Sequence, residues 1–346
     1  MNILSGVSDF FGLDIGTTAL RVVQLRGAGP VKSLDRYGQM PINGTAVLSD
    51  SKADRDNVSA TIREFVKQVG ITTRNVAVNV PSSKVFTTIT DWNKMPGDEL
   101  AKTIRYQADS IIPTPLNESK LDWVVVGQAP QDSNKVEVLL SSVPNDFVEL
   151  RLDMLESAGL NVIAFEPDGF ALSRALAQPN VAQPQLVLDT GNTSTDLIIT
   201  MDGIPRLIRS IPVGTSTMVR AVAQNLNIDV NQAEQFVFKF GLSKDKLEGR
   251  IHGAVISTVE AMVGEIDKSI KFFQNRYTNS KIDRIIVTGG ASVLPEFPLY
   301  LANKFGLNVE IGNAWRNVSF PPDRQNELMA VSSHFGVAAG LAERKE

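Results

Sequence analysis

Two short segments carry an aspartate, a glycine and a threonine at the same spacing, and these residue types suit the chemistry of phosphate and magnesium. The segments are FFGLDIGTTALRVVQL at residues 10–25 and LVLDTGNTSTDLIIT at residues 186–200. In each, an apolar stretch ends at an aspartate, Asp14 or Asp189. A turn rich in glycine and threonine offers backbone N–H groups and hydroxyls to phosphate oxygens. An aspartate at a strand end can hold Mg²⁺ directly or through water, so the pattern indicates a polyphosphate site.

Each segment also has the composition of a β-hairpin. Gly16 and Gly191 are expected to supply a positive φ at the turn, and the flanking β-branched residues favour strands. Two such hairpins facing each other would hold a polyphosphate from both sides. The alternative is two ordinary hairpins with turn-favouring residues.

The distance between the hairpins along the chain predicts a duplicated domain. Asp14 and Asp189 are 175 positions apart (189 minus 14), about half of the 346 residues. Solenoid repeats recur after about 20–50 residues, so the similarity is not that of a solenoid.

Composition excludes several classes of protein. The chain has 34 basic and 38 acidic residues, a net charge of −4, so no basic excess supports binding of nucleic acid. It has no cysteine and 2 histidines, which excludes disulfides, thiolate metal sites and a histidine-rich metal site. We find no P-loop, GxSxG or GxGxxG motif. No apolar run of about 18 residues occurs, so no transmembrane helix is expected. The first residues lack a basic region, so no signal peptide is expected, and the short charged ending LAERKE is not expected to form a long amphipathic membrane anchor.

Two further segments have residue types that could contact a nucleotide. Residues 284–306 are expected to form a strand, the pair Gly289-Gly290 and a helix, and a double glycine lets a flat nucleobase approach the backbone. An ordinary strand-to-helix turn is the alternative. In residues 163–176, Glu166 stands between a strand and a helix, where it could orient water near a γ-phosphate or simply favour the helix start.

Two helical segments complete the pattern. Residues 257–276 have apolar residues at helical spacing, with Glu265 and Lys268 off the apolar stripe, where an isolated pair is typical of a solvated surface. Residues 334–342, HFGVAAGLA, are small enough for close helix packing, which suits a pivot between two halves as well as simple tight packing.

The order of these motifs resembles that of the actin-like ATPase superfamily. Residues 13–21, including Arg21, resemble its first phosphate loop, and residues 186–200 resemble the second. The other matches are residues 163–176 and 334–342, which resemble the two connecting segments, and residues 285–297, which resemble the adenosine motif. This resemblance implies two α/β halves, each with a five-stranded sheet, around a cleft for ATP and Mg²⁺.

The region between the first hairpin and Glu166 resembles the family of type IV pilus assembly protein PilM. In residues 90–128 the matching features are a Met-Pro before an amphipathic helix, an Ile-Pro-x-Pro-Leu segment and a strand beginning Leu-Asp-Trp, and residues 136–167 continue the likeness. The cell-division protein FtsA shares this domain plan, but typically ends in an amphipathic membrane helix. The resemblance implies an actin-like duplicated α/β fold with an inserted PilM/FtsA-type subdomain. The predicted divisions are 1–82 with 161–181 (1A), 83–160 (the inserted 1C), 182–214 with 282–346 (2A) and 215–281 (2B).

The resemblance also implies a role for individual residues. Asp14 and Asp189 would hold hydrated Mg²⁺, Glu166 would position water, and Glu166 and Asp189 are the candidate catalytic residues. The predicted phosphate contacts are Gly16, Thr17, Thr18, Gly191, Asn192 and Thr193, and Arg21 and Gly214 are further predicted cofactor-binding residues. The predicted adenosine contacts are Glu234, Glu265, Lys268, Gly289, Gly290 and Ser292.

One position departs from the family pattern. Residues 211–241 resemble a segment with the pattern Ala-Glu-x-x-Lys-x-x-x-Gly, but Val237 stands at the lysine position and Lys239 lies two residues later. Two residues rotate a helical side chain by about 200°, so Lys239 is expected to face elsewhere. A scaffold that no longer binds nucleotide is therefore one alternative.

The function implied is that of an ATP-binding scaffold for type IV pilus, secretion or competence assembly, with slow or absent turnover. Its expected partner is the N-terminal tail of a PilN-like membrane protein, and a motor ATPase and a second copy of the chain are further candidates. No nucleic acid and no direct membrane insertion are expected, and the location would be cytoplasmic, peripheral to the inner face of the membrane. The alternatives are a sugar-kinase-like phosphotransferase and an FtsA-like filament-forming protein.

Overall fold

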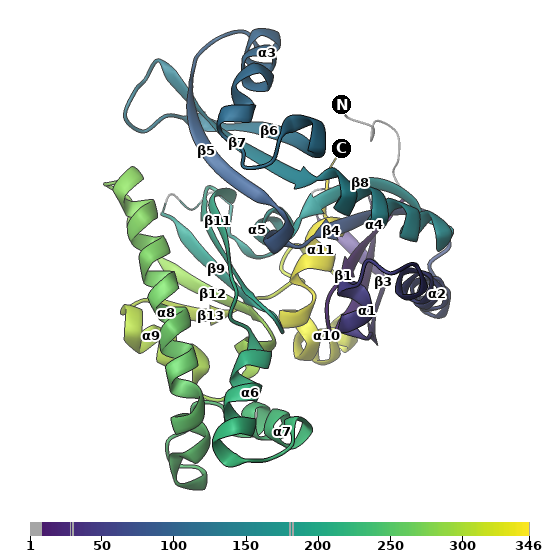
Figure 1. Ribbon diagram of the computed structural model, residues 1–346, viewed down its shortest axis with the longest axis vertical. Helices are drawn as coiled ribbons and strands as arrows, with labels where there is room; N and C mark the ends of the chain where they lie inside the picture. The colour runs from purple at the N-terminus through teal and green to yellow at the C-terminus, as the bar shows by residue number, and fades with distance from the viewer. Residues whose placement is uncertain (1–8, 28, 30, 180, 182, 346) are drawn as a thin grey trace.

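The computed structural model describes residues 9–345 apart from residues 28, 30, 180 and 182, and Figure 1 shows two lobes with a smaller unit beside them. The first eight residues lie outside the described residues. They are part of the N-terminal segment that is predicted not to be a signal peptide. The predicted subdomain boundaries at residues 1, 182 and 346 also lie outside the described residues.

The first lobe is built on a sheet with the strand order β14-β3-β2-β1-β4-β8. Its central strand β1 is buried along its whole length. Phe11 and Leu13 pack on helix α2 on one face, whereas Gly12 touches helix α11 on the other. The strands are β1 (Phe11–Ile15), β2 (Ala19–Arg26), β3 (Lys32–Pro41), β4 (Asn75–Val80), β8 (Asn161–Pro167) and β14 (Val318–Ser319). The helices on the two faces are α1 (Gly44–Leu48), α2 (Lys52–Val69), α4 (Asn145–Ser157), α5 (Asp168–Leu176), α10 (Gln325–Val331) and α11 (Gly336–Ala342).

The second lobe repeats this architecture. Its sheet has the order β11-β10-β9-β12-β13, which matches β3-β2-β1-β4-β8 strand for strand in both position and direction. The strands are β9 (Gln185–Thr190), β10 (Thr195–Met201), β11 (Ile204–Ile211), β12 (Arg284–Gly289) and β13 (Asn308–Ile311), and the helices are α6 (Thr215–Leu226), α7 (Val230–Phe240), α8 (Arg250–Arg276) and α9 (Phe297–Phe305). The repeated topology confirms the duplication, with β14 as an additional short strand in the first lobe.

The inserted unit has its own sheet and core. Strands β5 (Phe86–Asn93), β7 (Lys135–Pro144) and β6 (Ser119–Gln128) form an antiparallel sheet, and helix α3 (Gly97–Gln107) packs on it through Leu100 and Ile104. We call residues 86–144 the insert. The predicted division at 83–160 also contains α4, but Met154 and Leu155 of α4 lie in the core of the first lobe.

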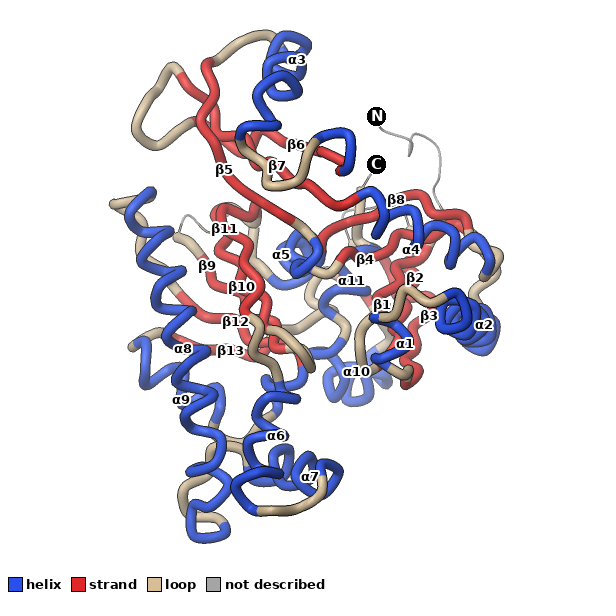
Figure 2. Tube along the Cα trace, in the orientation of Figure 1, coloured by secondary structure: helices blue, strands red, loops and turns tan. Residues whose placement is uncertain are grey.

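Helices α5 and α11 lie between the two sheets, and they bring the C-terminal residues back to the first lobe. Residues of both helices share one core cluster with strands of both lobes. An added Cβ at Gly340 of α11 would lie 1.9 Å from the carbonyl oxygen of Ala171 on α5, so the small residue permits this crossing. Figure 2 shows that helices α6 and α7 form the end of the second lobe that lies away from the insert. No helix among the described residues is long and apolar enough to cross a bilayer.

Candidate functional site

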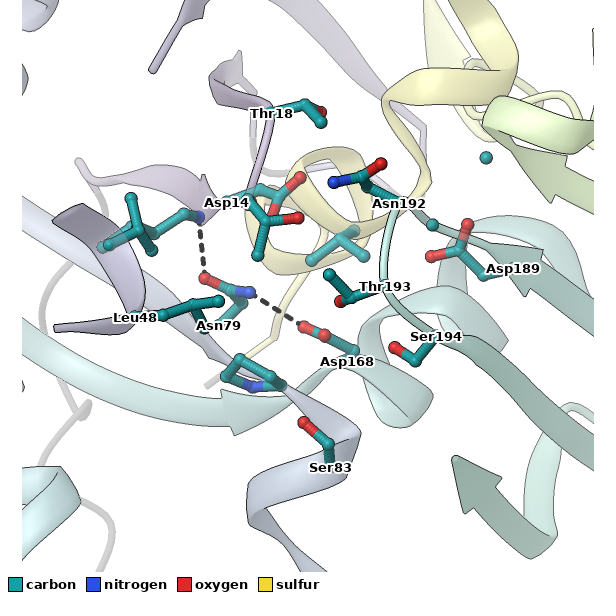
Figure 3. A pocket seen from close by; sticks show the side chains of 18 of the residues that line it. Asp14, Thr18, Leu48, Asn79, Ser83, Asp168, Asp189, Asn192, Thr193 and Ser194 are labelled. Atoms are coloured by element: carbon teal, nitrogen blue, oxygen red, sulfur yellow. Dashed lines mark hydrogen bonds between the residues drawn. The ribbon is translucent and has the colours of Figure 1, made fainter. Parts of the chain in front are cut away.

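The two hairpins predicted to bind phosphate open onto one cleft of 420 Å³ between the lobes. Asp14 stands near the end of β1 and Asp189 near the end of β9, which are equivalent central strands. Figure 3 shows Asp14 and Thr18 on one side of the cleft, with Asn192, Thr193 and Asp189 opposite. The predicted site residues that line the cleft are Asp14, Gly16, Thr17, Thr18, Arg21, Asp189, Gly191, Asn192, Thr193, Glu234, Gly289 and Gly290.

The two hairpin turns have the same hydrogen bonding. Gly16 N donates to Ala19 O at 3.2 Å, and Gly191 N donates to Ser194 O at 2.9 Å. Neither glycine has a positive φ, so that expectation was wrong. An added Cβ would lie 2.9 Å from Ala19 O at Gly16 and 3.3 Å from Ser194 O at Gly191, so closeness within the turn favours glycine.

The hairpins differ in charge at one equivalent position. Asp14 pairs across the strands with Arg21, and Asp189 pairs with Asp196 in the same register. Arg21 Nη1 lies 3.4 Å from Asp14 Oδ2. The first hairpin therefore carries one cation and one carboxylate, whereas the second carries two carboxylates.

Four aspartates give the cleft a strongly acidic interior. Burial raises the pKa of Asp14, which the guanidinium of Arg21 partly offsets, and burial also raises the pKa of Asp196. Burial and the charges of Asp196 and Asp14 raise the pKa of Asp189 to about 7. The same causes raise the pKa of Asp168 well above its usual range. A bound cation would favour the ionised form of these carboxyl groups and lower their pKa values.

The donor set fits a hydrated magnesium ion. In the part of the chain that the structure describes, no three His, Asp or Glu side chains lie close enough to ligate one metal. Mg²⁺ usually keeps several waters and binds through one or two carboxylates together with substrate phosphates. Asp14 and Asp189 on opposite walls could hold such an ion through its waters.

The double glycine lies in the wall of the cleft beside Asp189. Gly289 has φ +75°, and an added Cβ there would lie 2.4 Å from Asp189 Oδ1, so both conformation and space require glycine. Ser292 and Gly214 do not line the cleft. Ser292 Oγ donates to Gly289 O at 2.6 Å and holds the turn, while Gly214 packs on the backbone of Asn192. Ser292 and Gly214 therefore hold the cleft-lining residues Gly289 and Asn192 in place.

Helix α7 forms the wall near the double glycine. Glu234 and Phe238, one helical turn apart, both line the cleft, and Phe238 is 37% exposed. Val237 is instead buried in the core of the second lobe, and Lys239 does not line the cleft. Where the family pattern has a lysine, this chain therefore has the core residue Val237, and the next residue, Phe238, places an aromatic ring in the wall of the cleft.

Glu166 does not line the cleft, contrary to the sequence-based assignment. It is buried, and its two carboxylate oxygens accept from Arg174 at 2.5 Å and from Arg344 at 2.8 Å. A carboxylate held by two arginines cannot orient a distant water. Asp168, two residues later, does line the cleft and accepts from Asn79 Nδ2 at 3.1 Å (Figure 3). Asn79 Oδ1 in turn accepts from Ile15 N at 2.8 Å.

Glu265 and Lys268 also lie outside the cleft. They face solvent on α8 and pair with each other at 2.6 Å, as an isolated pair at this spacing would. Their assignment to adenosine is therefore not supported, because the apolar face of α8, not this one, packs into the lobe.

The cleft continues into a groove whose walls come from α1, α4 and the residues that connect the first lobe to the insert. Val47, Leu48, Phe147 and Leu150 give it apolar surface, and Lys84 and Arg151 give it charge. Arg151 is 9% exposed, lies over the Phe147 ring, and reaches Val47 O only at 3.5 Å. Burial lowers its pKa to about 10. A buried guanidinium with one long hydrogen bond can donate to a ligand in the groove.

The sequence did not predict four of the residues that line the cleft and its groove: Asp168, Phe238, Arg151 and Asp196. Asp168 carried a usable signal, because it is an aspartate in the first turn of a helix directly after a predicted site strand. Phe238 stands one residue after the position at which the family pattern was broken. No local pattern marks Arg151, whose place in the groove depends on packing between distant segments.

The comparisons with known proteins agree with this geometry. The model of the family "Type IV pilus assembly protein PilM" matches residues 12–346. A solved PilM-PilN type IV pilus biogenesis complex is similar at 26% identity with a TM-score of 0.81, over 96% of this chain and 97% of that one. The ethanolamine utilization protein EutJ of Carboxydothermus hydrogenoformans is similar at 15% identity and a TM-score of 0.58, over 96% and 88% of the two chains. MreB5 of Spiroplasma citri bound to AMPPNP is similar at 13% identity and a TM-score of 0.55, over 96% and 95%.

The two similarities below 25% identity show the fold alone, and the architecture is the actin-like one that the motif order predicted. Since the family model spans nearly the whole chain, the chain belongs to the family of type IV pilus assembly protein PilM.

Proposed function

We propose that the chain is an ATP-binding scaffold of type IV pilus assembly that binds the N-terminal tail of a PilN-like membrane protein. The observation that carries the nucleotide part is the pair of equivalent hairpins facing each other across one cleft. The partner part rests on family membership and on similarity to a solved PilM-PilN complex. The scaffold would sit at the cytoplasmic face of the membrane through this partner.

In the proposed complex, each part of the cleft contacts a different part of the nucleotide. The turns at Gly16–Thr18 and Gly191–Thr193 would bind phosphate oxygens, and Asp14 and Asp189 would accept hydrogen bonds from the waters of Mg²⁺. The ion would supply positive charge that offsets both the carboxylates and the phosphates. Gly289, Gly290, Glu234 and Phe238 would surround the adenosine. Asp168 replaces Glu166 as the carboxylate that could face a water near the γ-phosphate, and we expect turnover to be slow or absent.

The tail of the partner would bind in the groove between α1 and α4. Arg151 could donate to peptide carbonyl oxygens there, and Val47, Leu48, Phe147 and Leu150 would cover apolar side chains. Bound nucleotide would set the angle between the lobes and thereby the shape of this groove.

The test of this function is equilibrium titration of Mg·ATP and of a synthetic tail peptide. We expect the wild type to bind both ligands. Asp189→Ala should weaken Mg·ATP binding by about tenfold or more, which corresponds to about 1.4 kcal/mol. Asp56→Ala is the matched control, because Asp56 pairs with Lys52 on the exposed surface of α2. If Asp189→Ala changes neither ATP affinity nor peptide affinity, the proposed coupling of nucleotide to partner fails.

Phe238→Ala tests the base-binding wall. Stacking of a base on an aromatic ring contributes about 1–3 kcal/mol, so we expect a loss of Mg·ATP affinity of that size. Binding of Mg·tripolyphosphate, which has no base, should stay the same. Tyr106→Ala, which removes an exposed aromatic ring on α3, serves as control. Equal losses for ATP and tripolyphosphate would show that Phe238 supports the fold of the cleft rather than the base.

Arg151→Met tests the groove, because methionine retains the apolar part of the side chain and removes the donors. Hydrogen bonds to charged groups contribute about 1.5–3 kcal/mol, so tail-peptide affinity should fall by that amount. Mg·ATP affinity should change little. Arg220→Met on the exposed surface of α6 is the control. Unchanged peptide affinity in Arg151→Met would place the tail elsewhere.

A further inference from the structure

The insert is covalently part of the first lobe, yet in the regions that the structure describes most of its side-chain hydrogen bonds and ion pairs to other units reach the second lobe. The chain enters the insert after β4 and leaves it into α4, and both of these elements belong to the first lobe. Among the described residues, one side-chain hydrogen bond joins the insert to the first lobe, from Asn145 Nδ2 to Asn117 O at 2.9 Å. The contacts with the second lobe are more numerous and are charged.

Glu137 of β7 is the centre of these contacts. It is 2% exposed, and its Oε1 accepts from Arg276 Nε at 2.9 Å and from Arg276 Nη2 at 2.7 Å, both at the end of α8. The same oxygen accepts from Tyr277 Oη at 2.8 Å, and Arg206 of β11 lies 3.6 Å from the other oxygen. Arg276 also pairs with Asp91 of β5.

Backbone groups extend this junction along β11. Arg206 Nη2 donates to Val126 O at 2.6 Å, and Thr87 Oγ1 donates to Ile208 O at 3.4 Å. Separating the insert from the second lobe would break the hydrogen bonds and ion pairs of Glu137 and Arg276 together, and hydrogen bonds to charged groups contribute more to stability than those between neutral groups. Within the described ranges of the chain, moving the insert relative to the first lobe would break one side-chain hydrogen bond, at Asn117.

The chain connections between the insert and the first lobe line the partner groove. Ser83 and Lys84 belong to the first connection, and Phe147, Leu150 and Arg151 belong to the start of α4, directly after the second. The chain must bend at these two connections when the insert moves relative to the first lobe, so the groove lies beside the hinge of that motion.

From these contacts we propose that the insert moves with the second lobe as one unit, and that this motion regulates the partner groove. Closure of the lobes on a nucleotide carries the insert with it and reshapes the hinge residues that contact the tail. Glu137 and Arg276 are the positioning residues that transmit the change. The inference rests on the proposed function, because it concerns the regulation of the same tail groove. Coupling between two ligands is reciprocal, so bound tail must change nucleotide affinity by the same factor.

The first experiment measures this factor. The dissociation constant of the synthetic tail peptide is determined without nucleotide and with saturating Mg·AMPPNP, for the wild type and for Glu137→Gln. We expect a change of about fivefold or more in the wild type, in the range usual for allosteric pairs. In Glu137→Gln the factor should approach one, while each ligand alone still binds. Glu260→Gln is the matched control, because Glu260, like Glu137, accepts from a tyrosine and from a cationic side chain, here Tyr300 and Lys304, but within the second lobe.

The second experiment leaves Glu137 intact and therefore does not depend on how well that variant folds. Because the chain has no cysteine, two introduced cysteines can be spin-labelled specifically. Labels at Tyr106→Cys and Leu299→Cys report the distance from the insert to the second lobe, and labels at Tyr106→Cys and Lys67→Cys report the distance to the first lobe. On addition of Mg·AMPPNP the first distance should stay constant and the second should change.

The outcomes separate the two proposals. An unchanged coupling factor in Glu137→Gln, or an insert that keeps its distance to the first lobe while the other distance changes, overturns the inference and leaves the proposed function standing. Binding of both ligands to the wild type with no effect of one on the other overturns the inference together with the proposed coupling of nucleotide to partner, and leaves only the two binding sites standing. Failure of the wild type to bind either ligand overturns the proposed function and the inference together.

Discussion

Gly340→Ala should destabilise the protein by about 3 kcal/mol or more, at or above the upper end of the usual cost of overpacking. The added Cβ would lie 1.9 Å from the carbonyl oxygen of Ala171 and 2.5 Å from its carbonyl carbon. These are backbone atoms of α5, which cannot rotate away as a side chain can. Helices α5 and α11 would therefore have to separate, and they share one core with strands of both lobes.

Urea denaturation of Gly340→Ala and of two control variants checks this expectation. Gly253 and Gly264 lie inside α8, and an added Cβ would meet no atom within 4 Å at either position. Alanine there should raise stability by about 0.5–1 kcal/mol, because it lowers the entropy that the backbone loses on folding. A Gly340→Ala protein as stable as the wild type would show that the two helices can separate without cost, and hence that the crossing is not tight.

The nucleotide-free protein should lose stability as the pH rises through the range in which Asp189 ionises. Burial and neighbouring carboxylates raise the pKa of Asp189 from 3.8 to about 7 in the folded state. The folded protein then keeps a proton that the unfolded chain has released, so stability falls with rising pH between these two values. For this group alone, the loss between about pH 5 and about pH 8 is about 3 kcal/mol. Asp14, Asp168 and Asp196 have pKa values shifted in the same direction and add to the effect.

Asp189→Asn provides the control, since the amide has the same shape and no charge. We expect its stability at about pH 8 to exceed that of the nucleotide-free wild type, and its pH dependence to be smaller. Part of the dependence should remain, because burial also raises the pKa of Glu343, which does not line the cleft, to about 7. Mg·ATP should reverse the loss in the wild type, because its cation favours the ionised carboxylates. A wild type that becomes more stable from pH 5 to pH 8 without nucleotide would contradict the acidic-cleft interpretation.

The hairpins could be predicted from the sequence because their geometry is local. The turn of each one is closed by a hydrogen bond between residues only three apart, Gly16 with Ala19 and Gly191 with Ser194. Recurrence of the same residue types after half the chain then predicts the duplication, and equivalent strands in a duplicated fold place their ends in equivalent positions. The phosphate-binding side of the cleft therefore needed no long-range information beyond the repeat.

The places of other residues depend on contacts between distant parts of the chain. Glu166 and Asp168 are two residues apart, and which of them reaches the cleft depends on arginines at positions 174 and 344 that hold the first one. The face that Glu265 and Lys268 occupy depends on how α8 rotates against the second lobe. The place of α4 in the first lobe depends on its packing against α2 and the sheet.

The sequence by itself thus determined the fold class, the two hairpins and the double glycine, because turn chemistry and strand patterns act over a few residues. Only the tertiary structure decided which carboxylates share the cleft, where the groove lies, and that Glu137 joins the insert to a helix end 139 positions away. The physical reason is that burial and charge pairing are properties of a site in space. Residues with the same local pattern acquire different roles according to the distant side chains that pack against them.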